Sequence, residues 1–140
     1  MNTIHPQLLN DSLVLGTFPL CHLLLAKDAN YPWFILVPNR DNISEIHQLS
    51  ASDQQQLVVE SSALGKRLMT ALQGDKLNVA ALGNIVPQLH VHVIVRYKKD
   101  AAWPGPIWGK VTAKAYGEHE LIKLKDQLKT LALPNFTSAD

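Results

Sequence analysis

The sequence predicts an α+β fold, in which an antiparallel β-sheet of about five strands carries one long central helix and a C-terminal helix. Three observations support this prediction. The segments follow the order strand, strand, strand, long helix, strand, strand, helix, which is not a repeating βαβ pattern. Short turn-forming stretches separate neighbouring strands, as they do in hairpins. The 140 residues contain no repeat and no linker, so we expect a single domain over residues 1–140.

The N-terminal part of the chain is expected to supply three strands. Residues 1–12 are polar and Pro6 should break any early helix, so this stretch is predicted to be irregular. A short strand over residues 13–17 ends at Phe18-Pro19. Strands over residues 20–27 and 33–37 flank a stretch rich in turn formers, which predicts an antiparallel hairpin.

The clearest predicted element is a long helix that begins near Ser50. Ser50 and Asp53 have the spacing of a capping box, and Gly74 suits a left-handed helix end. Leucines recur between them at spacings of three and four, so one apolar stripe of the helix should face a core. Further strands are expected over residues 77–82 and 88–96, and a last helix over residues 118–131.

The strand over residues 88–96 is the most informative segment, because successive side chains of a strand point to opposite faces. The face that the long helix should cover carries Leu89, Val91, Val93 and Val95. The opposite face carries Gln88, His90 and His92. A strand buried on both faces normally consists of continuous aliphatic residues. We therefore interpret the histidine face as a functional site that is open to a ligand.

Composition limits the classes of partner and compartment. With 13 basic and 12 acidic residues, no global field favours nucleic acid or a membrane surface as a partner. Cys21 is the one cysteine, so neither a disulfide framework nor a Cys-x-x-Cys metal site is expected, and its thiol should be buried and inert. The sequence has neither the start of a signal peptide nor an apolar stretch long enough to span a bilayer, so we expect a soluble cytoplasmic protein.

The residues alone leave three roles open for His90 and His92. Zinc binding needs three or four protein ligands, and no other histidine has a spacing that marks it as a third. A structural role would need only a backbone carbonyl for each ring. Chemistry on phosphorus could use one neutral imidazole as a nucleophile and the other as a proton donor to a departing oxygen. Gln88 and Asn84 would then donate hydrogen bonds to phosphate oxygens. We favour this third role because the alternation places these groups on one face.

This same segment resembles a known family. Residues 83–94, Gly-Asn-Ile-Val-Pro-Gln-Leu-His-Val-His-Val-Ile, are similar to the signature of the histidine triad (HIT) superfamily, in which three histidines alternate with apolar residues. Residues 23–38 are similar to the paired strands of the family, and residues 49–72 lie where the family has its long helix. Trp103-Pro104-Gly105 is similar to a tail segment of one branch. The resemblance implies a HIT-like fold.

The resemblance also implies a role for each matched residue. His90 would attack the α-phosphate of a nucleotide to give a nucleotidyl-histidine that water then cleaves. His92 would lie near the bridging oxygen of the leaving group, and Asn84 would bind phosphate. The resemblance further implies a homodimer, a nucleotide substrate, and catalysis that requires neither a cofactor nor a metal.

Within the signature segment, the chain departs from the family pattern at two positions. Gln88 replaces the first histidine of the triad, and Ile85 replaces a serine or threonine hydroxyl. In the family, a main-chain carbonyl at the position of Gln88 orients the Nδ1–H group of the nucleophile. Gln88 keeps that carbonyl, so it is counted with the catalytic residues.

Three further side chains are candidates around the site. Trp33 is expected in the wall of the nucleotide pocket. Arg96 follows the same alternation as His90 and His92, so it either contacts phosphate or is a surface arginine at a strand end. Trp108, like Trp103, either stacks on a base or simply packs.

The leading functional hypothesis is a nucleotide hydrolase or transferase. It would act on the α-phosphate of a nucleoside phosphoramidate or (poly)phosphate through a covalent intermediate at His90. The alternative is a nucleotide-binding module with little or no catalysis, which the changes at Gln88 and Ile85 motivate.

Overall fold

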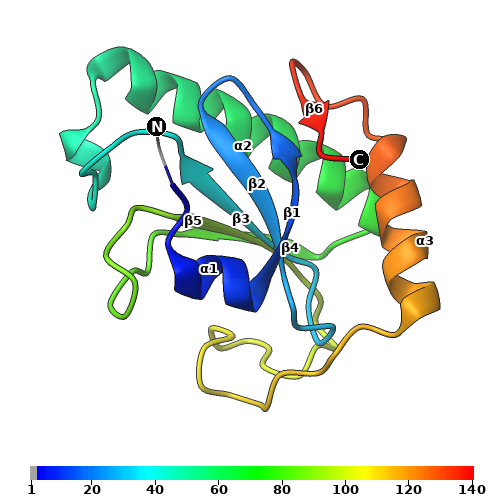
Figure 1. Cartoon of the computed structure of the whole chain (residues 1–140). Coiled ribbons are helices and arrows are strands. Elements are labelled where there is room, and N and C mark those ends of the chain that lie inside the picture. The colour runs from blue at the N-terminus through cyan, green and yellow to red at the C-terminus, as the bar shows by residue number, and fades with distance from the viewer. Residues whose placement is uncertain (1–2) are drawn as a thin grey trace.

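A six-stranded antiparallel sheet forms the centre of the computed structural model, which describes residues 3–140 (Figure 1). The strand order is β4-β5-β3-β2-β1-β6. The strands are β1 (Ser12–Thr17), β2 (Cys21–Ala26), β3 (Trp33–Pro38), β4 (Lys76–Ala80), β5 (Val91–Arg96) and β6 (Thr137–Ser138). The α-helices are α1 (Pro6–Asp11), α2 (Ala51–Leu72) and α3 (Glu118–Lys129). This arrangement confirms the predicted α+β class.

Two short elements differ from the sequence-based expectation. Residues 6–11 form α1, although Pro6 was expected to prevent an early helix. Pro6 is the first residue of α1, where a missing N–H costs nothing because that group has no partner inside the helix. The sheet also gains β6, a two-residue strand that pairs with β1 at the edge.

One face of the sheet packs against α2 and α3. Leu57, Leu64 and Leu68 of α2 lie in the same buried cluster as the alternating residues of β5. Those β5 and adjacent residues are Leu89, Val91, Val93 and Val95, as predicted. Leu124 of α3 belongs to the same cluster, so both longer helices cover this face.

The opposite face of the sheet is covered only in part. Ile4 and Leu8, in and before α1, pack on Leu24, Ile35 and Val37. Elsewhere on this face the segment after β5 packs Ala102 and Ile107 against Tyr31 and Ile94. A cavity remains on this face of the sheet, and His90 and His92 are among the residues that line it.

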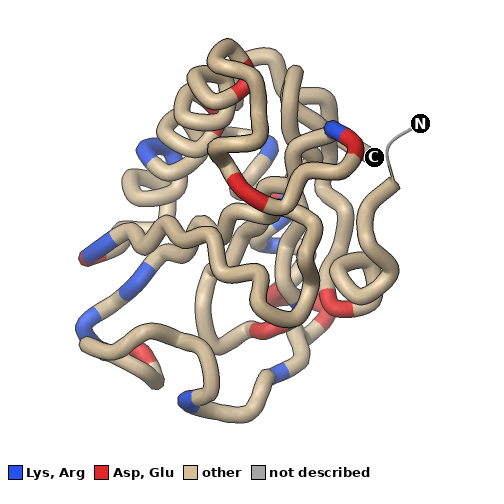
Figure 2. Tube along the Cα trace, turned by 90° about the vertical axis from the view of Figure 1, so that its left-hand side faces the viewer, with Lys and Arg blue, Asp and Glu red and all other residues tan. Residues whose placement is uncertain are grey.

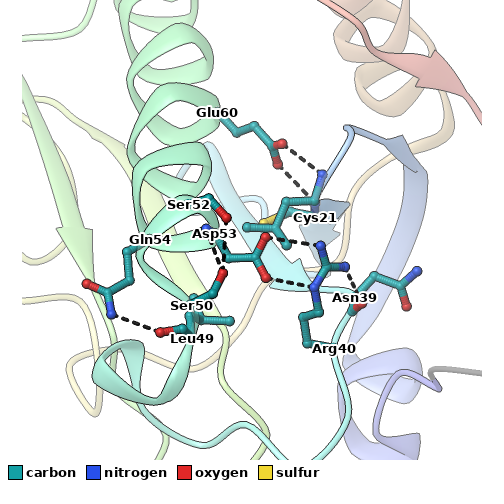
Figure 3. Close-up of polar contacts among 10 residues, drawn as sticks. Cys21, Asn39, Arg40, Leu49, Ser50, Ser52, Asp53, Gln54 and Glu60 are labelled. Atoms are coloured by element: carbon teal, nitrogen blue, oxygen red, sulfur yellow. Dashed lines mark hydrogen bonds and ion pairs between the residues drawn. The ribbon is translucent and has the colours of Figure 1, made fainter.

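A buried carboxyl group fixes α2 to the turn between β1 and β2 (Figure 3). Glu60 is only 2% exposed, and its two carboxyl oxygens accept hydrogen bonds from the backbone N–H groups of Leu20 (2.8 Å) and Cys21 (2.9 Å). Gln56, one turn earlier in α2, donates to the same carboxyl group. Burial, with Glu60 adjacent, raises the pKa of the Cys21 thiol, and Cys21 is buried as expected.

The N-terminus of α2 has a second connection to the sheet. The hydroxyl of Ser50 accepts a hydrogen bond from the N–H of Asp53, which makes Ser50 the predicted helix cap. The Asp53 carboxylate in turn accepts two hydrogen bonds from Arg40, which follows β3. Both ends of this contact are visible in Figure 3.

Charged residues do not gather by sign along the chain. Figure 2 shows acidic and basic positions interspersed along the trace, in keeping with the near-balanced composition. None of the helices within residues 3–140 is both long enough and apolar enough to cross a membrane.

Replacing Glu60 with alanine is expected to lower the free energy of unfolding by about 3 kcal/mol, because two buried backbone N–H groups lose their acceptor. Chemical denaturation monitored by circular dichroism measures this change. Gln55→Ala is the matched control, since Gln55 is exposed on the same helix and should change stability by less than ~0.5 kcal/mol. Equal losses in both variants would contradict the anchoring role of Glu60.

Candidate functional site

The two histidines lie side by side in the wall of a cavity on the open face of the sheet. His92 is in β5 and His90 directly precedes this strand; both are at most 5% exposed and their ring centroids are 5.0 Å apart. The cavity has a volume of about 610 Å³. Its walls come from α1, the ends of β1 and β2, β3, residues 82–86, Trp108 and Ala113. Segments distant in the sequence therefore meet at the histidines.

The hydrogen bond of His90 determines which of its nitrogens is available. Its Nδ1 lies 2.7 Å from the main-chain oxygen of Gln88. A carbonyl oxygen only accepts hydrogen bonds, so Nδ1 carries the proton and the lone pair of the neutral ring is on Nε2. No hydrogen bond within residues 3–140 uses that Nε2. His90 therefore has the arrangement of a nucleophile.

His92 has a partner at each ring nitrogen. The indole Nε1–H of Trp33 donates to Nδ1 of His92 at 2.9 Å, and Nε2 of His92 lies 3.4 Å from the carbonyl oxygen of Leu82. Burial first, and then the neighbouring His90, lower the pKa of His92 to about 4, against a smaller raising effect of the Leu82 carbonyl. His92 is therefore neutral at physiological pH.

Gln88 is not placed as the sequence predicted. The strand begins at Val91 rather than at residue 88, so the alternation does not extend to Gln88. Its side-chain oxygen accepts from the N–H of His5 at 2.7 Å, and its amide nitrogen donates to the carbonyl of Thr3 at 3.0 Å. The side chain thus holds the N-terminal segment, and it is the main-chain carbonyl of Gln88 that bonds to His90.

Arg96 is a structural residue in this arrangement, not a surface arginine, and it does not line the cavity. Its side chain is 2% exposed and forms a bidentate ion pair with Asp100, with Nε–Oδ2 at 2.8 Å and Nη2–Oδ1 at 3.0 Å. It also donates to Asn78 of β4 and to the carbonyl of Gly105. All three guanidinium nitrogens are occupied, so the expectation of a phosphate contact is not supported.

The Arg96–Asp100 pair holds the segment that brings Trp108 to the site. Burial alone would raise the pKa of Asp100, but Arg96 and the backbone N–H groups of Tyr97, Ala102 and Trp103 outweigh it and lower the pKa to about 2. Trp108 then packs against His92 in a T-shaped arrangement, at a centroid distance of 5.0 Å. The ion pair does not line the cavity, but it anchors the segment from which Trp108 reaches the cavity wall.

Trp33 and Asn84 line the cavity, and their role in nucleotide binding stays a prediction. Sequence reasoning missed Ser12, which is 4% exposed and whose hydroxyl has no hydrogen-bond partner within residues 3–140. It also missed the charged residues Asp11, Lys27 and Asp28 of the same cavity. These four side chains have no distinguishing local pattern, because α1 and the β2 end come together only in the folded chain.

A cluster of three or more His, Cys, Asp or Glu side chains able to hold a metal ion is not found among residues 3–140.

Asp100→Asn is expected to lower the free energy of unfolding by about 3 kcal/mol at pH 7, because Arg96 is left buried without its counter-ion. The folded-state pKa of Asp100 is depressed, so its contribution is complete above the pKa of the unfolded chain and is lost as the pH falls. The gap between wild type and variant should therefore shrink between about pH 4 and pH 2. Denaturant titrations at several pH values measure it, with Asp126→Asn as the exposed control. A gap that does not change with pH would contradict this role.

Comparisons with known proteins identify the family to which the fold belongs. The model of the HIT domain family matches residues 7–99. A histidine triad protein from Marinobacter aquaeolei is 49% identical, with a TM-score of 0.91 over 94% of this chain and 96% of that chain. One from Bradyrhizobium japonicum is 44% identical, with a TM-score of 0.89 over 91% of this chain and 95% of that chain. One from Sinorhizobium meliloti is 40% identical, with a TM-score of 0.89 over 92% and 96%.

No match was found among curated proteins. The family match covers well over half of the 140 residues and includes both histidines of the cavity. The chain belongs to the HIT domain family.

Proposed function

We propose that this protein is a nucleotide hydrolase or transferase that acts on the α-phosphate of a nucleoside phosphoramidate or (poly)phosphate. The covalent intermediate would be a nucleotidyl-histidine at His90. HIT family proteins are generally nucleotide hydrolases or transferases, which supports the class of activity.

The observation that carries the proposal is the hydrogen bond between Nδ1 of His90 and the carbonyl of Gln88. It places the lone pair on Nε2 of a ring that lines the cavity, and it keeps this ring in one orientation. We propose that Gln88 takes the position of the first triad histidine and contributes this carbonyl, while its side chain forms hydrogen bonds to the N-terminal segment. The loss of an imidazole at that position then leaves the nucleophile intact.

The proposed reaction has two steps. In the first, Nε2 of His90 forms a bond to the α-phosphorus, and the bond to the leaving group breaks with its electron pair. In the second, water attacks the phosphorus, the P–N bond breaks and its electron pair returns to Nε2, and a proton of the water passes to solvent. Asn84 and His92 lie in the same cavity and would donate hydrogen bonds to the phosphoryl oxygens and the departing oxygen.

His90→Ala should lower the rate of AMP release from adenosine phosphoramidate, ADP or diadenosine tetraphosphate by at least ~10³-fold, because the nucleophile is lost. Chromatographic detection of AMP measures the rate, and mass spectrometry of the quenched wild type should find a nucleotide adduct on His90. His119→Ala, on the exposed surface of α3, is the matched control and should retain the wild-type rate.

Tight binding of AMP without turnover of any of the three substrates would contradict the hydrolase proposal. It would favour the alternative, a nucleotide-binding module with little or no catalysis. Release that is equally fast in His90→Ala would exclude His90 as the nucleophile.

We also propose that the protein is a homodimer that pairs through β4. This strand is at the sheet edge, and Val79 on it is 51% exposed. Ile85, in the loop after β4, is 90% exposed. An exposed strand edge with apolar side chains is suited to pairing with a second copy.

Val79→Arg is expected to convert the dimer to a monomer, because a cation would be buried at the pairing edge. Sedimentation velocity of wild type and variant measures the mass. Ile122→Arg changes an equally exposed apolar residue on α3 and should leave the dimer intact. A wild type that sediments as a monomer would contradict the proposal.

A further inference from the structure

We infer that Trp33 is a positioning residue that holds His92 in the neutral tautomer with its proton on Nε2. His92 then donates a hydrogen bond to the departing oxygen but does not transfer its proton. The part that concerns the leaving group rests on the proposed function, whereas the part that concerns the tautomer does not.

Two independent contacts fix the same tautomer. An indole N–H is a donor only, so Nδ1 of His92, 2.9 Å from Nε1 of Trp33, must be unprotonated. A carbonyl oxygen is an acceptor only, so Nε2 of His92, 3.4 Å from the oxygen of Leu82, carries the hydrogen. The contact to Leu82 is long, and a substrate oxygen in the cavity can replace it.

Strand register explains why Trp33 reaches this nitrogen. In the β3–β5 pair Trp33 lies opposite Ile94 and Ile35 lies opposite His92. Trp33 is thus the diagonal neighbour of His92 on the same face, a distance that a large aromatic side chain spans. The two ring centroids are 5.7 Å apart, and Trp108 contacts both rings.

Protonation of His92 is opposed by its surroundings. A second ring proton would be placed on Nδ1 and would face the N–H of Trp33, so the hydrogen bond between them would be lost. Burial and the adjacent His90 act in the same direction, and both lower the pKa of His92. The other charged side chains of the cavity are Asp11, the last residue of α1, and Lys27 and Asp28, which follow β2. These groups are the same in wild type and in the variants below.

This arrangement selects a class of leaving group. A phosphate or phenolate departs with the electron pair of the broken P–O bond as a stable anion, and a hydrogen bond from Nε2–H of His92 stabilises it. An amine departing from a phosphoramidate requires a proton on nitrogen, which a locked neutral imidazole does not supply. The preferred substrates would therefore be nucleoside di- or polyphosphates and activated phosphate esters, not phosphoramidates.

The first experiment reads the tautomer directly. Nitrogen-15 NMR of histidine-labelled wild-type protein should show Nε2 of His92 protonated and Nδ1 unprotonated near neutral pH. In Trp33→Phe the pKa of His92 should rise by about one unit, the change expected when one hydrogen bond that requires the unprotonated Nδ1 is lost. Trp108→Phe is the matched control, because Trp108 contacts the same ring without a hydrogen bond to it and should leave the tautomer unchanged.

The second experiment compares leaving groups in the same proteins. Wild type should cleave adenosine 5′-(4-nitrophenyl phosphate) much faster than adenosine phosphoramidate. In Trp33→Phe, where His92 is able to hold a proton, the ratio of these rates should fall by at least ~10-fold. The phosphoramidate rate of that variant should rise as the pH is lowered.

The outcomes distinguish the positioning role of Trp33 from the proposed hydrolase function. An Nδ1–H tautomer in the wild type, which needs no variant to detect, overturns the inference. So does a His92 pKa that is the same in Trp33→Phe and wild type, or a ratio of rates that does not change. A third outcome is the expected tautomer and pKa shift without turnover of either substrate. It would support the positioning role of Trp33 and contradict the proposed hydrolase.

Discussion

The two-residue repeat of β5 is the constraint on which the rest of the structure depends. This strand lies inside the sheet between β3 and β4, so side chains on both of its faces need partners. One face is committed to the core under α2. On the other face Ile94 packs with Tyr31, Arg96 pairs with Asp100, and His92 accepts a hydrogen bond from Trp33. Core, loop and cavity are thus arranged around one strand.

The main elements of the fold were predictable because they follow from local periodicity. The leucine spacing after Ser50 predicted α2, and the apolar alternation of residues 89–95 predicted which face it covers. The predictions were wrong where a single residue, or a single contact between distant segments, determines the local structure. Pro6 begins a helix instead of preventing it, and Thr137 pairs with β1 across most of the chain length. No local pattern records such a contact.

The candidate site was predictable in its histidines but not in its walls. The alternation of His90 and His92 is visible in the sequence, and the structure places both rings at one cavity. Arg96 follows the same alternation but does not line the cavity. The chain turns after β5, so Asp100 comes close to Arg96 and binds its guanidinium group. Gln88 precedes the strand, so the alternation does not apply to it. Ser12 and Trp108 reach the cavity from distant segments, which only the folded chain brings together.

The glutamine at position 88 has a consequence for how the cavity responds to acid. Its carboxamide accepts from His5 and donates to Thr3, and so closes the N-terminal segment, with α1, over the cavity. A neutral imidazole at this position could also accept one hydrogen bond and donate another, but on protonation it would become a donor at both nitrogens. The carboxamide does not titrate. The two hydrogen bonds that position 88 makes to the N-terminal segment therefore persist at a pH at which a histidine in its place would lose one of them.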